Sequence, residues 1–263
     1  MMLNDKVAVV YGAGGAIGGA VARAFAGEGA RVFLTGRRRE PIEAMAEDIS
    51  AHGGIAKADA VDALDEAAVG KHLRSVVDRA GRLDISFNAV GLPNATSLGR
   101  PFVELDAAEF ALPITAYATS YFLTARLAAR HMIPRRSGVI MTISALPARA
   151  GTPMNGGYGP AQAAKEALTR DLSVELAPQG IRVVCLRPHG IPETPTMRRV
   201  FEKKRATMGA TWDQFQAFLA HTAHSRRVMV MDELTHLAVF IASDKASGMT
   251  GTTVNLTMGA ASD

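Results

Sequence analysis

Short apolar runs rich in β-branched residues alternate with longer segments of helical spacing along most of the chain. The runs predict buried strands at residues 6–11, 31–35, 84–88, 138–144, 181–188 and 252–256. The intervening spacing predicts helices within residues 16–30, 40–54, 65–81, 107–132 and 161–180. Strands that alternate with helices indicate a parallel sheet covered on both faces. The sequence therefore predicts an α/β fold with a three-layer, doubly wound parallel sheet.

The chain is long enough to bury one sizeable core. It has 263 residues, of which 48% are hydrophobic, and no linker or internal repeat, so we expect a single domain over residues 1–263. Residues 195–225 interrupt the alternation and place Trp212, Phe215 and Leu219 at helical spacing. We interpret this segment as an amphipathic helix packed on the body, as a lid over a substrate pocket, or as both.

Charge and cysteine content limit the classes of partner. The 29 basic and 25 acidic residues are mostly scattered and form neither a nucleic-acid tract nor a membrane-binding stripe. Cys185 is the only cysteine, which excludes an internal disulfide and is compatible with a reducing compartment. The N-terminal apolar run is too short for a signal peptide or a membrane span. We therefore expect a cytoplasmic, soluble protein that binds neither nucleic acid nor membrane and has no metal site.

A glycine-rich turn, VVYGAGGAIGGA, follows the first predicted strand and opens the first predicted helix. Glycines there permit a tight turn and let backbone N–H groups approach a pyrophosphate at the helix N-terminus. Its place in the alternating pattern favours a dinucleotide site, and with it a Rossmann-type fold, over a purely structural turn. The turn resembles the T-G-x-x-x-G-x-G motif of the short-chain dehydrogenase/reductase family, with alanine at the middle glycine. The resemblance implies cofactor contacts from Gly12, Gly14, Gly15, Ile17 and Gly18.

Further segments extend this resemblance over nearly the whole chain. DISFNAVG is similar to the N-N-A-G block of the family, and KADAVD is similar to the segment that hydrogen-bonds the adenine. RPHGIPET is similar to the P-G-x-I-x-T loop that clamps the nicotinamide amide, with His189 in place of the glycine. MTGTTVNL is similar to the closing strand. By position, the resemblance implies cofactor contacts from Asn88, Ala89, Gly91, Asp59, Ile191 and Thr194.

The residues after the second predicted strand select between the two nicotinamide dinucleotides. An acidic side chain at this point holds the ribose 2′-hydroxyl of NAD. Gly36 takes that position here, and Arg37 and Arg38 follow it. Because a guanidinium fork suits a 2′-phosphate, we expect NADP(H) rather than NAD(H). The alternative is that the two arginines form only a solvated basic turn.

The Asn-Ser-Tyr-Lys tetrad of the family is incomplete in this chain. Tyr158 matches the tyrosine, which exchanges a proton with the substrate oxygen. Ala145 stands at the serine that holds this oxygen, Gln162 at the lysine that lowers the pKa of the tyrosine, and Tyr117 at the asparagine. Lys165 lies about 10 Å beyond Tyr158 along the helix axis. We consider that distance too long for the role of the lysine.

Four side chains are candidate helpers of Tyr158. Ser144 is adjacent to the serine position, although neighbours on a strand face opposite sides. Gln162 keeps an amide that can donate to ribose hydroxyls and can thereby also bind the cofactor, Tyr117 adds a second phenol, and His189 titrates near neutrality. Structural alternatives remain: helix packing for Tyr117, no role for His189, and an apolar plug for Tyr158.

The altered tetrad favours reduction over oxidation. A free tyrosine has a pKa of about 10, so roughly one part in a thousand is the phenolate that alcohol oxidation needs at neutral pH. Carbonyl reduction uses the neutral phenol as an acid. We therefore expect an NADP(H)-dependent oxidoreductase that reduces a small carbonyl or an activated alkene.

Two other classes remain open, because fold alone does not decide function. One is a non-redox cyclase, dehydratase or isomerase, and the other is a silent protein that binds NADP(H) or a ligand without turnover. The family resemblance also implies a small-molecule substrate and a homodimer or homotetramer. Such an assembly would use the alanine-rich faces of the helices predicted within residues 107–132 and 161–180.

Overall fold

Seven parallel strands form one sheet in the computed structural model, which describes residues 1–92 and 97–262 apart from the side chains of residues 206–208. The strand order is β3-β2-β1-β4-β5-β6-β7, and every neighbouring pair is parallel. The strands are β1 (Val7–Tyr11), β2 (Arg31–Gly36), β3 (Ile55–Ala60), β4 (Ile85–Asn88), β5 (Gly138–Ile143), β6 (Ile181–Pro188) and β7 (Thr252–Leu256).

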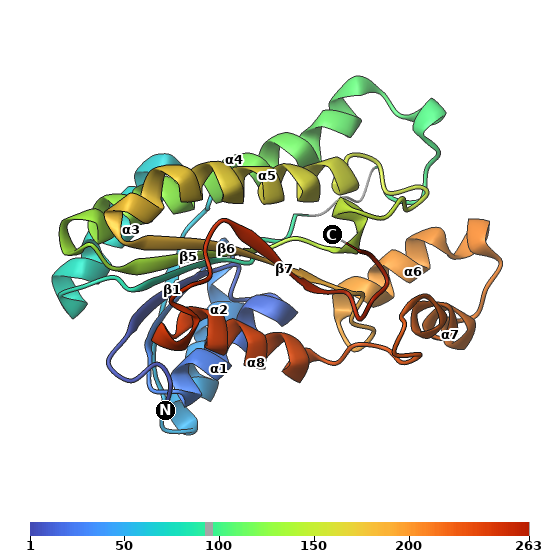
Figure 1. Cartoon of the computed structure of the whole chain (residues 1–263). Helices are drawn as coiled ribbons and strands as arrows, with labels where there is room; N and C mark the ends of the chain where they lie inside the picture. Colours follow the sequence, from blue (N-terminus) through green and yellow to red (C-terminus); the bar gives the residue numbers. More distant parts are fainter. Residues whose placement is uncertain (93–96, 263) are drawn as a thin grey trace.

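Helices cover both faces of this sheet. The helices are α1 (Ala16–Gly27), α2 (Arg39–Ala51), α3 (Glu66–Ala80), α4 (Ala107–Met132), α5 (Tyr158–Leu176), α6 (Pro195–Met208), α7 (Trp212–Thr222) and α8 (Met231–Ala242). Short 3₁₀ helices occupy Phe102–Glu104 (η1), Ile133–Arg135 (η2), Leu146–Ala148 (η3), Ala177–Gln179 (η4) and Asp244–Ala246 (η5). Helices α3, α4 and α5 lie on one face, and α1, α2 and α8 lie on the other (Figure 1).

Two buried apolar layers pack against the sheet, one on each side, and a third, smaller apolar cluster lies in α6 and α7. Residues at alternate positions of a strand belong to opposite layers: Val7 and Val9 pack under α3 to α5, whereas Ala8 and Val10 pack against α1, α2 and α8. This is the period of two that a strand imposes on its side chains. The predicted three-layer, doubly wound α/β fold is confirmed.

Two elements were not predicted from the sequence. β3 is the edge strand of the sheet, and its residues are exposed or only partly buried. It therefore lacks the continuous apolar run by which buried strands are recognised. α8 follows the segment at residues 195–225, in which the alternation of strands and helices is interrupted. The other six strands lie within one or two residues of their predicted bounds.

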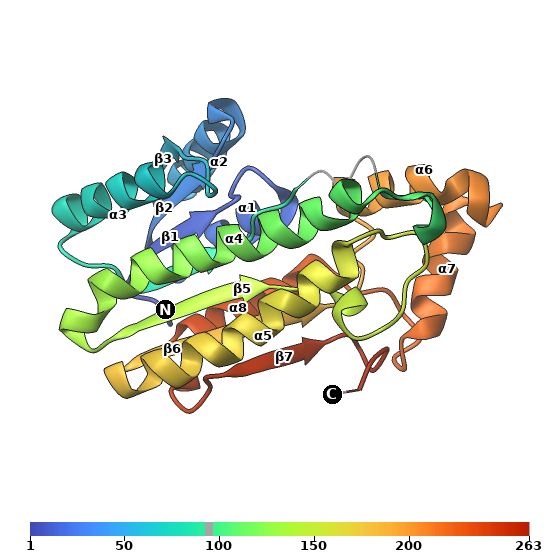
Figure 2. The ribbon, with the colours of Figure 1, turned by 90° about the horizontal axis from the view of Figure 1, so that it is seen from above.

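The order of the strands places a switch point between β1 and β4. The chain moves outward from β1 to β3 and then returns to the other side of β1, so loops at the carboxyl ends of β1 and β4 diverge. Crevices at such points are the usual ligand sites of open parallel sheets. Figure 2 shows α6 and α7 beyond the carboxyl ends of the strands, beside the start of α5. The segment at residues 195–225 is thus two helices rather than one.

We expect Gly18→Ala to lower the free energy of unfolding by about 1–3 kcal/mol, because a methyl group there cannot be accommodated without a shift of backbone. A Cβ on Gly18 would lie 2.3 Å from the carbonyl oxygen of Gly12. Gly27→Ala is the matched control in the same helix, since nothing lies within 4 Å of its added Cβ. Urea unfolding followed by circular dichroism measures both. Equal stability of the two variants would contradict the close approach of α1 to the glycine turn.

Candidate active site

The glycine turn joins β1 to α1 at the carboxyl edge of the sheet. Gly12 has a φ of +77°, and a Cβ there would lie 2.5 Å from the carbonyl oxygen of Ala89. Only glycine fits this left-handed position so close to the loop after β4. Gly15 is the N-cap of α1 and provides no side-chain hydrogen bond, while Gly14 and Ala16 are exposed. The first N–H groups of α1 therefore remain available to an anion.

The two predicted cofactor arginines lie beside this glycine turn. A Cβ on Gly14 would lie 3.0 Å from the Cβ of Pro41, so the turn packs against the start of α2. Arg37 and Arg38 are exposed, and neither guanidinium forms an ion pair or a hydrogen bond with any residue that the structure describes. By contrast, Arg39 is paired at 3.3 Å with a glutamate of α2. Two unpaired cations thus stand next to the available helix N-terminus.

The end of β4 is fixed by the side chain of Asn88. Its Nδ2 donates to Oγ1 of Thr124 in α4 at 3.0 Å, and its Oδ1 accepts from the backbone N–H of Val90 at 3.2 Å. The amide therefore holds the loop after β4 against α4. Ala89 is partly buried, and Gly91 is exposed with open space around it, so both backbones border the switch point.

Asp59 does not face the carboxyl edge of the sheet. It lies within β3, and its carboxylate pairs with Arg79 at 3.6 Å and with His72 at 3.5 Å, both on α3. The structure therefore argues against the predicted contact between Asp59 and an adenine. Asp62 is the first acidic residue beyond the strand end, and its Oδ1 accepts from the backbone N–H of Leu64 at 3.0 Å. Because β3 lacks the apolar pattern of a buried strand, its carboxyl end is not evident from the sequence. The sequence therefore pointed to Asp59 rather than Asp62.

Tyr158 is the first residue of α5 and stands at the same edge of the sheet. Its ring packs edge-to-face on the ring of Tyr117, with centroids 5.9 Å apart. Within the described chain, no group donates to its hydroxyl or accepts from it. Burial, and secondarily the neighbouring Tyr117, raises the pKa of the Tyr158 phenol far above its usual value. The phenol is consequently a neutral acid throughout the physiological pH range.

The positions at which the family resemblance predicts a lysine and a serine carry neither a charge nor a hydroxyl. Gln162 lies one turn after Tyr158 and is only 2% exposed, yet its amide has no hydrogen-bond partner among the residues described. Its amide atoms are not among the fully buried polar atoms that lack a partner, so they keep some contact with the surroundings and are free to meet a ligand or water. Ala145 follows β5 with extended backbone as the N-cap of η3.

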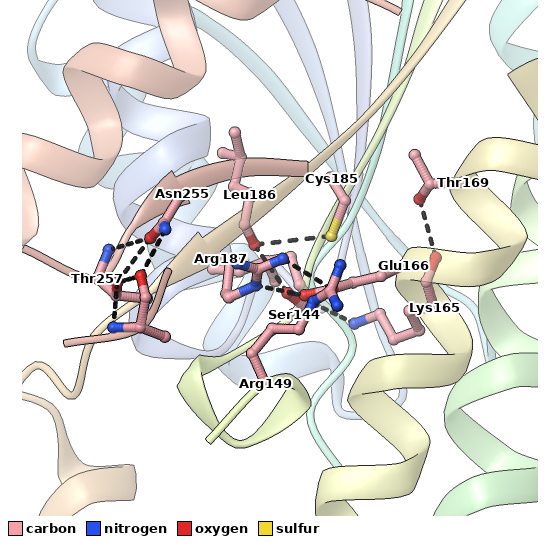
Figure 3. Close-up of polar contacts among 12 residues, drawn as sticks. Ser144, Arg149, Lys165, Glu166, Thr169, Cys185, Leu186, Arg187, Asn255 and Thr257 are labelled. Carbon is pink, nitrogen blue, oxygen red and sulfur yellow. Dashed lines mark hydrogen bonds and ion pairs between the residues drawn. The ribbon is translucent and has the colours of Figure 1, made fainter. Parts of the chain in front are cut away.

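Ser144 is engaged elsewhere, as Figure 3 shows. Its Oγ donates to Oε1 of Glu166 at 2.8 Å. Arg187 of β6 binds the same carboxylate through Nε at 2.7 Å and Nη2 at 2.9 Å. All three side chains are buried between α5 and the sheet. This network argues against Ser144 as a substitute for the missing serine.

Lys165 comes closer to the site than its place in the helix predicts. In a helix each Cα–Cβ bond tilts toward the N-terminus, so the long side chain extends back toward the start of α5. Its Nζ donates to the carbonyl oxygen of Ile143, the last residue of β5, and lies 5.4 Å from the centroid of the Tyr117 ring. Among the residues that the structure describes, Lys165 makes no contact with Tyr158, so the prediction that it cannot take the role of the family lysine stays a prediction, while its amine reaches the Tyr117 ring.

The loop after β6 connects the sheet to the two outer helices. His189 is buried, and its Nε2 lies 3.4 Å from Oγ1 of Thr222 in α7. Burial lowers the pKa of His189, which favours the neutral imidazole. Ile191 is buried, and the Thr194 hydroxyl donates to its carbonyl oxygen at 2.8 Å. The histidine is thus placed against α7, and its predicted help to Tyr158 remains untested.

The structure adds one side chain that the sequence did not single out. Lys204 of α6 is 5% exposed, and its Nζ donates to the carbonyl oxygen of Pro153 at 2.7 Å and to Oδ1 of Asn155 at 2.5 Å. The carbonyl oxygen of Asn155 in turn accepts from the backbone N–H of Tyr158 at 3.1 Å. This lysine therefore connects α6 to the segment that leads into α5. No motif or periodicity marks it in the sequence.

The arrangement supplies a neutral proton donor and an anion-binding turn. Among residues 1–92 and 97–262, no group of three His, Cys, Asp or Glu side chains is placed to hold a metal ion. Within the same residues, no helix combines the length and the apolar character that a membrane crossing requires.

A family model described as enoyl-(acyl carrier protein) reductase matches residues 12–261. The uncharacterized oxidoreductase YxjF of Bacillus subtilis (strain 168) is 30% identical over 259 residues, which cover 97% of each chain. Sorbitol-6-phosphate 2-dehydrogenase of Escherichia coli (strain K12) is 27% identical over 260 residues, with 97% of this chain and 98% of that protein covered.

Solved structures show the same arrangement. A crystal structure of NAD⁺-bound xylitol dehydrogenase superposes with a TM-score of 0.90 at 28% identity and covers 97% of this chain and 99% of its own. A crystal structure of a variant of actinorhodin polyketide ketoreductase with NADPH has a TM-score of 0.88 at 23% identity, with 97% of each chain covered. The latter likeness establishes the fold alone.

Proposed function

The chain belongs to the short-chain dehydrogenase/reductase family, and from this premise we propose that it is an NADP(H)-dependent reductase of a small carbonyl or activated alkene. The observation that carries the cofactor preference is the pair of unpaired, exposed guanidiniums beside the glycine turn. The observation that carries the direction of reaction is a neutral phenol to whose hydroxyl no ammonium group of the described residues is bound.

The residues at the carboxyl edge fit a dinucleotide. The uncapped N-terminus of α1 would receive the pyrophosphate, and Arg37 and Arg38 would receive the 2′-phosphate. The adenine contact is assigned to Asp62, which follows the end of β3, in place of Asp59, whose carboxylate is paired with Arg79. The unpartnered amide of Gln162 suits the nicotinamide ribose. When bound, the reduced nicotinamide supplies a hydride.

Tyr158 donates a proton in this proposal. Reduction of a carbonyl leaves negative charge on the substrate oxygen, and a positioned acid that neutralises this charge is worth about 10²–10⁴-fold in rate. The missing serine removes a second donor to the same oxygen, so the proposed enzyme is slow with simple ketones. An activated alkene depends less on this donor, because its enolate can take a proton from another group. The description of the matching family model as an enoyl reductase supports that variant.

We expect Arg37→Ala to weaken NADPH binding by about 10–100-fold and NADH binding much less, because a charge-assisted hydrogen bond contributes about 1.5–3 kcal/mol. Nicotinamide fluorescence titrations of both cofactors measure the two losses. Arg39→Ala is the matched control, since Arg39 is engaged by Glu43 in α2 and should not contact the cofactor. Equal losses of NADPH and NADH affinity in Arg37→Ala would refute the 2′-phosphate assignment.

The same titration separates this proposal from its alternatives. Absence of NADPH binding would end the reductase proposal and weaken that of a silent cofactor-binding protein. Binding without NADPH consumption by a panel of ketones, aldehydes and enones would favour a non-redox enzyme or a silent protein.

We further propose that α6 and α7 act as a substrate lid, because Lys204 and Thr222 connect them to the two loops that border the site. A cytoplasmic homodimer or homotetramer is part of the same proposal.

A further inference from the structure

One buried ammonium near the site has no role in the proposed reaction. Lys165 is 1% exposed, and its Nζ contacts only the carbonyl oxygen of Ile143 and the face of the Tyr117 ring. Glu166 is the next residue along the helix, but its carboxylate is taken by Arg187. Among the residues that the structure describes, no carboxylate lies within ion-pair distance of Lys165.

Such an ammonium lowers the stability of the fold. Burial lowers the pKa of Lys165 to about 8, so the amine is still mostly protonated near pH 7. The Glu166 carboxylate acts on this ammonium without an ion pair, and a buried charge that lacks a direct ion pair is less favourable than an apolar side chain of the same length. A residue that breaks the rules of core composition is expected at a functional site. The contacts of Lys165 should therefore reveal what it does.

The ring of Tyr117 links Lys165 to the reactive phenol. One side of this ring receives the ammonium at 5.4 Å, and Tyr158 packs edge-to-face on the ring at 5.9 Å. The Tyr117 hydroxyl accepts from the backbone N–H of Leu92 at 3.1 Å, which ties the ring to the loop after β4. Tyr117 is buried and thus contacts the cation, the phenol and a site loop simultaneously.

We propose that Lys165 and Tyr117 form a positioning unit for Tyr158, in place of the lysine and asparagine that this chain lacks. The ammonium holds the Tyr117 ring by a cation–π contact and holds the end of β5 through Ile143. Tyr117 in turn restricts the ring of Tyr158. Neither residue touches the reacting atoms. Their effect on rate rests on the proposed function, whereas their effect on the Tyr158 ring does not.

The activity-independent test is NMR of protein labelled with ¹³C at Cζ of tyrosine. The chain has four tyrosines, so Tyr158→Phe assigns the Tyr158 signal. We expect Lys165→Met and Tyr117→Leu each to shift or broaden this signal. Tyr117→Phe is the matched control, because it keeps the ring between Lys165 and Tyr158 and should leave the signal in place.

The second test measures turnover and stability together. With NADPH and any substrate that the wild type reduces, Lys165→Met and Tyr117→Leu should each lower kcat by about 10–100-fold, the effect of a slightly misplaced acid. The double variant should match the single variants, because residues that act as one unit are not additive. Lys165→Met should keep or raise the Tm, since it removes a buried charge. A lower kcat in a more stable protein excludes a general loss of structure.

Two results would overturn the positioning unit. One is a Tyr158 signal that neither Lys165→Met nor Tyr117→Leu changes. The other is a double variant whose loss of kcat is the product of the single losses. If the wild type reduces no substrate, the proposed function fails, and the NMR signal alone decides whether Lys165 and Tyr117 hold the Tyr158 ring.

Discussion

Restoring two of the three tetrad side chains that this chain is expected to lack should convert the protein into an alcohol dehydrogenase: Ala145→Ser with Gln162→Lys is expected to raise alcohol oxidation by about 10³-fold or more. A serine hydroxyl at position 145 supplies a donor to the substrate oxygen, and loss of such a donor typically costs about 10²–10³-fold. A lysine at position 162 lies one turn from Tyr158 and lowers the pKa of its phenol, which raises the phenolate fraction.

The surroundings of Gln162 determine whether the Gln162→Lys substitution can be accommodated and in which background it is best tested. The amide is buried without a protein partner, so a lysine of similar length replaces it without breaking a hydrogen bond. Lys165 reaches back toward the same region, and two buried ammonium groups there would repel each other. The restoration is therefore made both alone and with Lys165→Met, and we expect the larger gain with Lys165 retained, because Lys165→Met relieves the repulsion but removes the proposed positioning of Tyr158.

Initial rates of NADP⁺ reduction with secondary alcohols at neutral pH measure the gain. Ala145→Ser and Gln162→Lys are the single-variant controls, and each should give a smaller increase. NADPH affinity should stay unchanged, which shows that the gain arises in the chemical step. A double variant that binds NADPH but oxidises no alcohol would mean that the pocket departs from hydride transfer in more than these two residues. The non-redox alternative would then gain support.

Removal of the Tyr158 hydroxyl should abolish most of the proposed reductase activity. Tyr158→Phe is expected to lower kcat for NADPH-dependent reduction by about 10²–10⁴-fold, since the phenol is the only acid assigned to the substrate oxygen. The ring contact with Tyr117 is kept, and the lost hydroxyl has no recorded hydrogen-bond partner within the described chain. Thermal stability and NADPH affinity should therefore remain those of the wild type.

A second phenol provides the control for this variant. Tyr121 is fully buried, and its hydroxyl bonds Oγ1 of Thr169 at 3.1 Å, so Tyr121→Phe should cost about 1 kcal/mol of stability without a change in kcat. The wild-type rate should also show no alkaline loss from Tyr158 below a pH of about 10, because burial raises the pKa of its phenol above the ordinary value. Full activity of Tyr158→Phe would identify Tyr158 as an apolar plug instead.

The architecture was predictable because its causes are local in the chain. Buried strands such as β6 are nearly continuous apolar runs, and helices such as α4 repeat their apolar residues at helical spacing. The glycine turn was predictable for the same reason: a left-handed Gly12 and the close approach at Gly18 leave a fixed spacing in the sequence. The edge strand β3 escaped because its exposure removes the pattern that marks a buried strand.

The residues of the site were predictable only where a motif fixes them. The losses at positions 145 and 162 follow from spacing to Tyr158, and the arginine turn follows from the end of β2. Where a side chain points depends instead on elements distant in the sequence. The Ser144 hydroxyl donates to Glu166, whose carboxylate is also bound by Arg187. The Asp59 carboxylate is paired with a residue of α3.

The doubly wound sheet and the family were predictable from the residues alone, and so was the expectation that the usual lysine is replaced. Periodicity and motif spacing indicate these features, because helices, strands and turns are caused by short-range sterics and by the burial of apolar side chains. By contrast, the direction in which another lysine, seven residues after Tyr158, turns its amine back toward the site follows from the packing of the folded chain. The position of the Lys165 amine depends on how α4, α5 and the end of β5 pack against one another. These elements are distant in the sequence, so no local pattern predicts their contact.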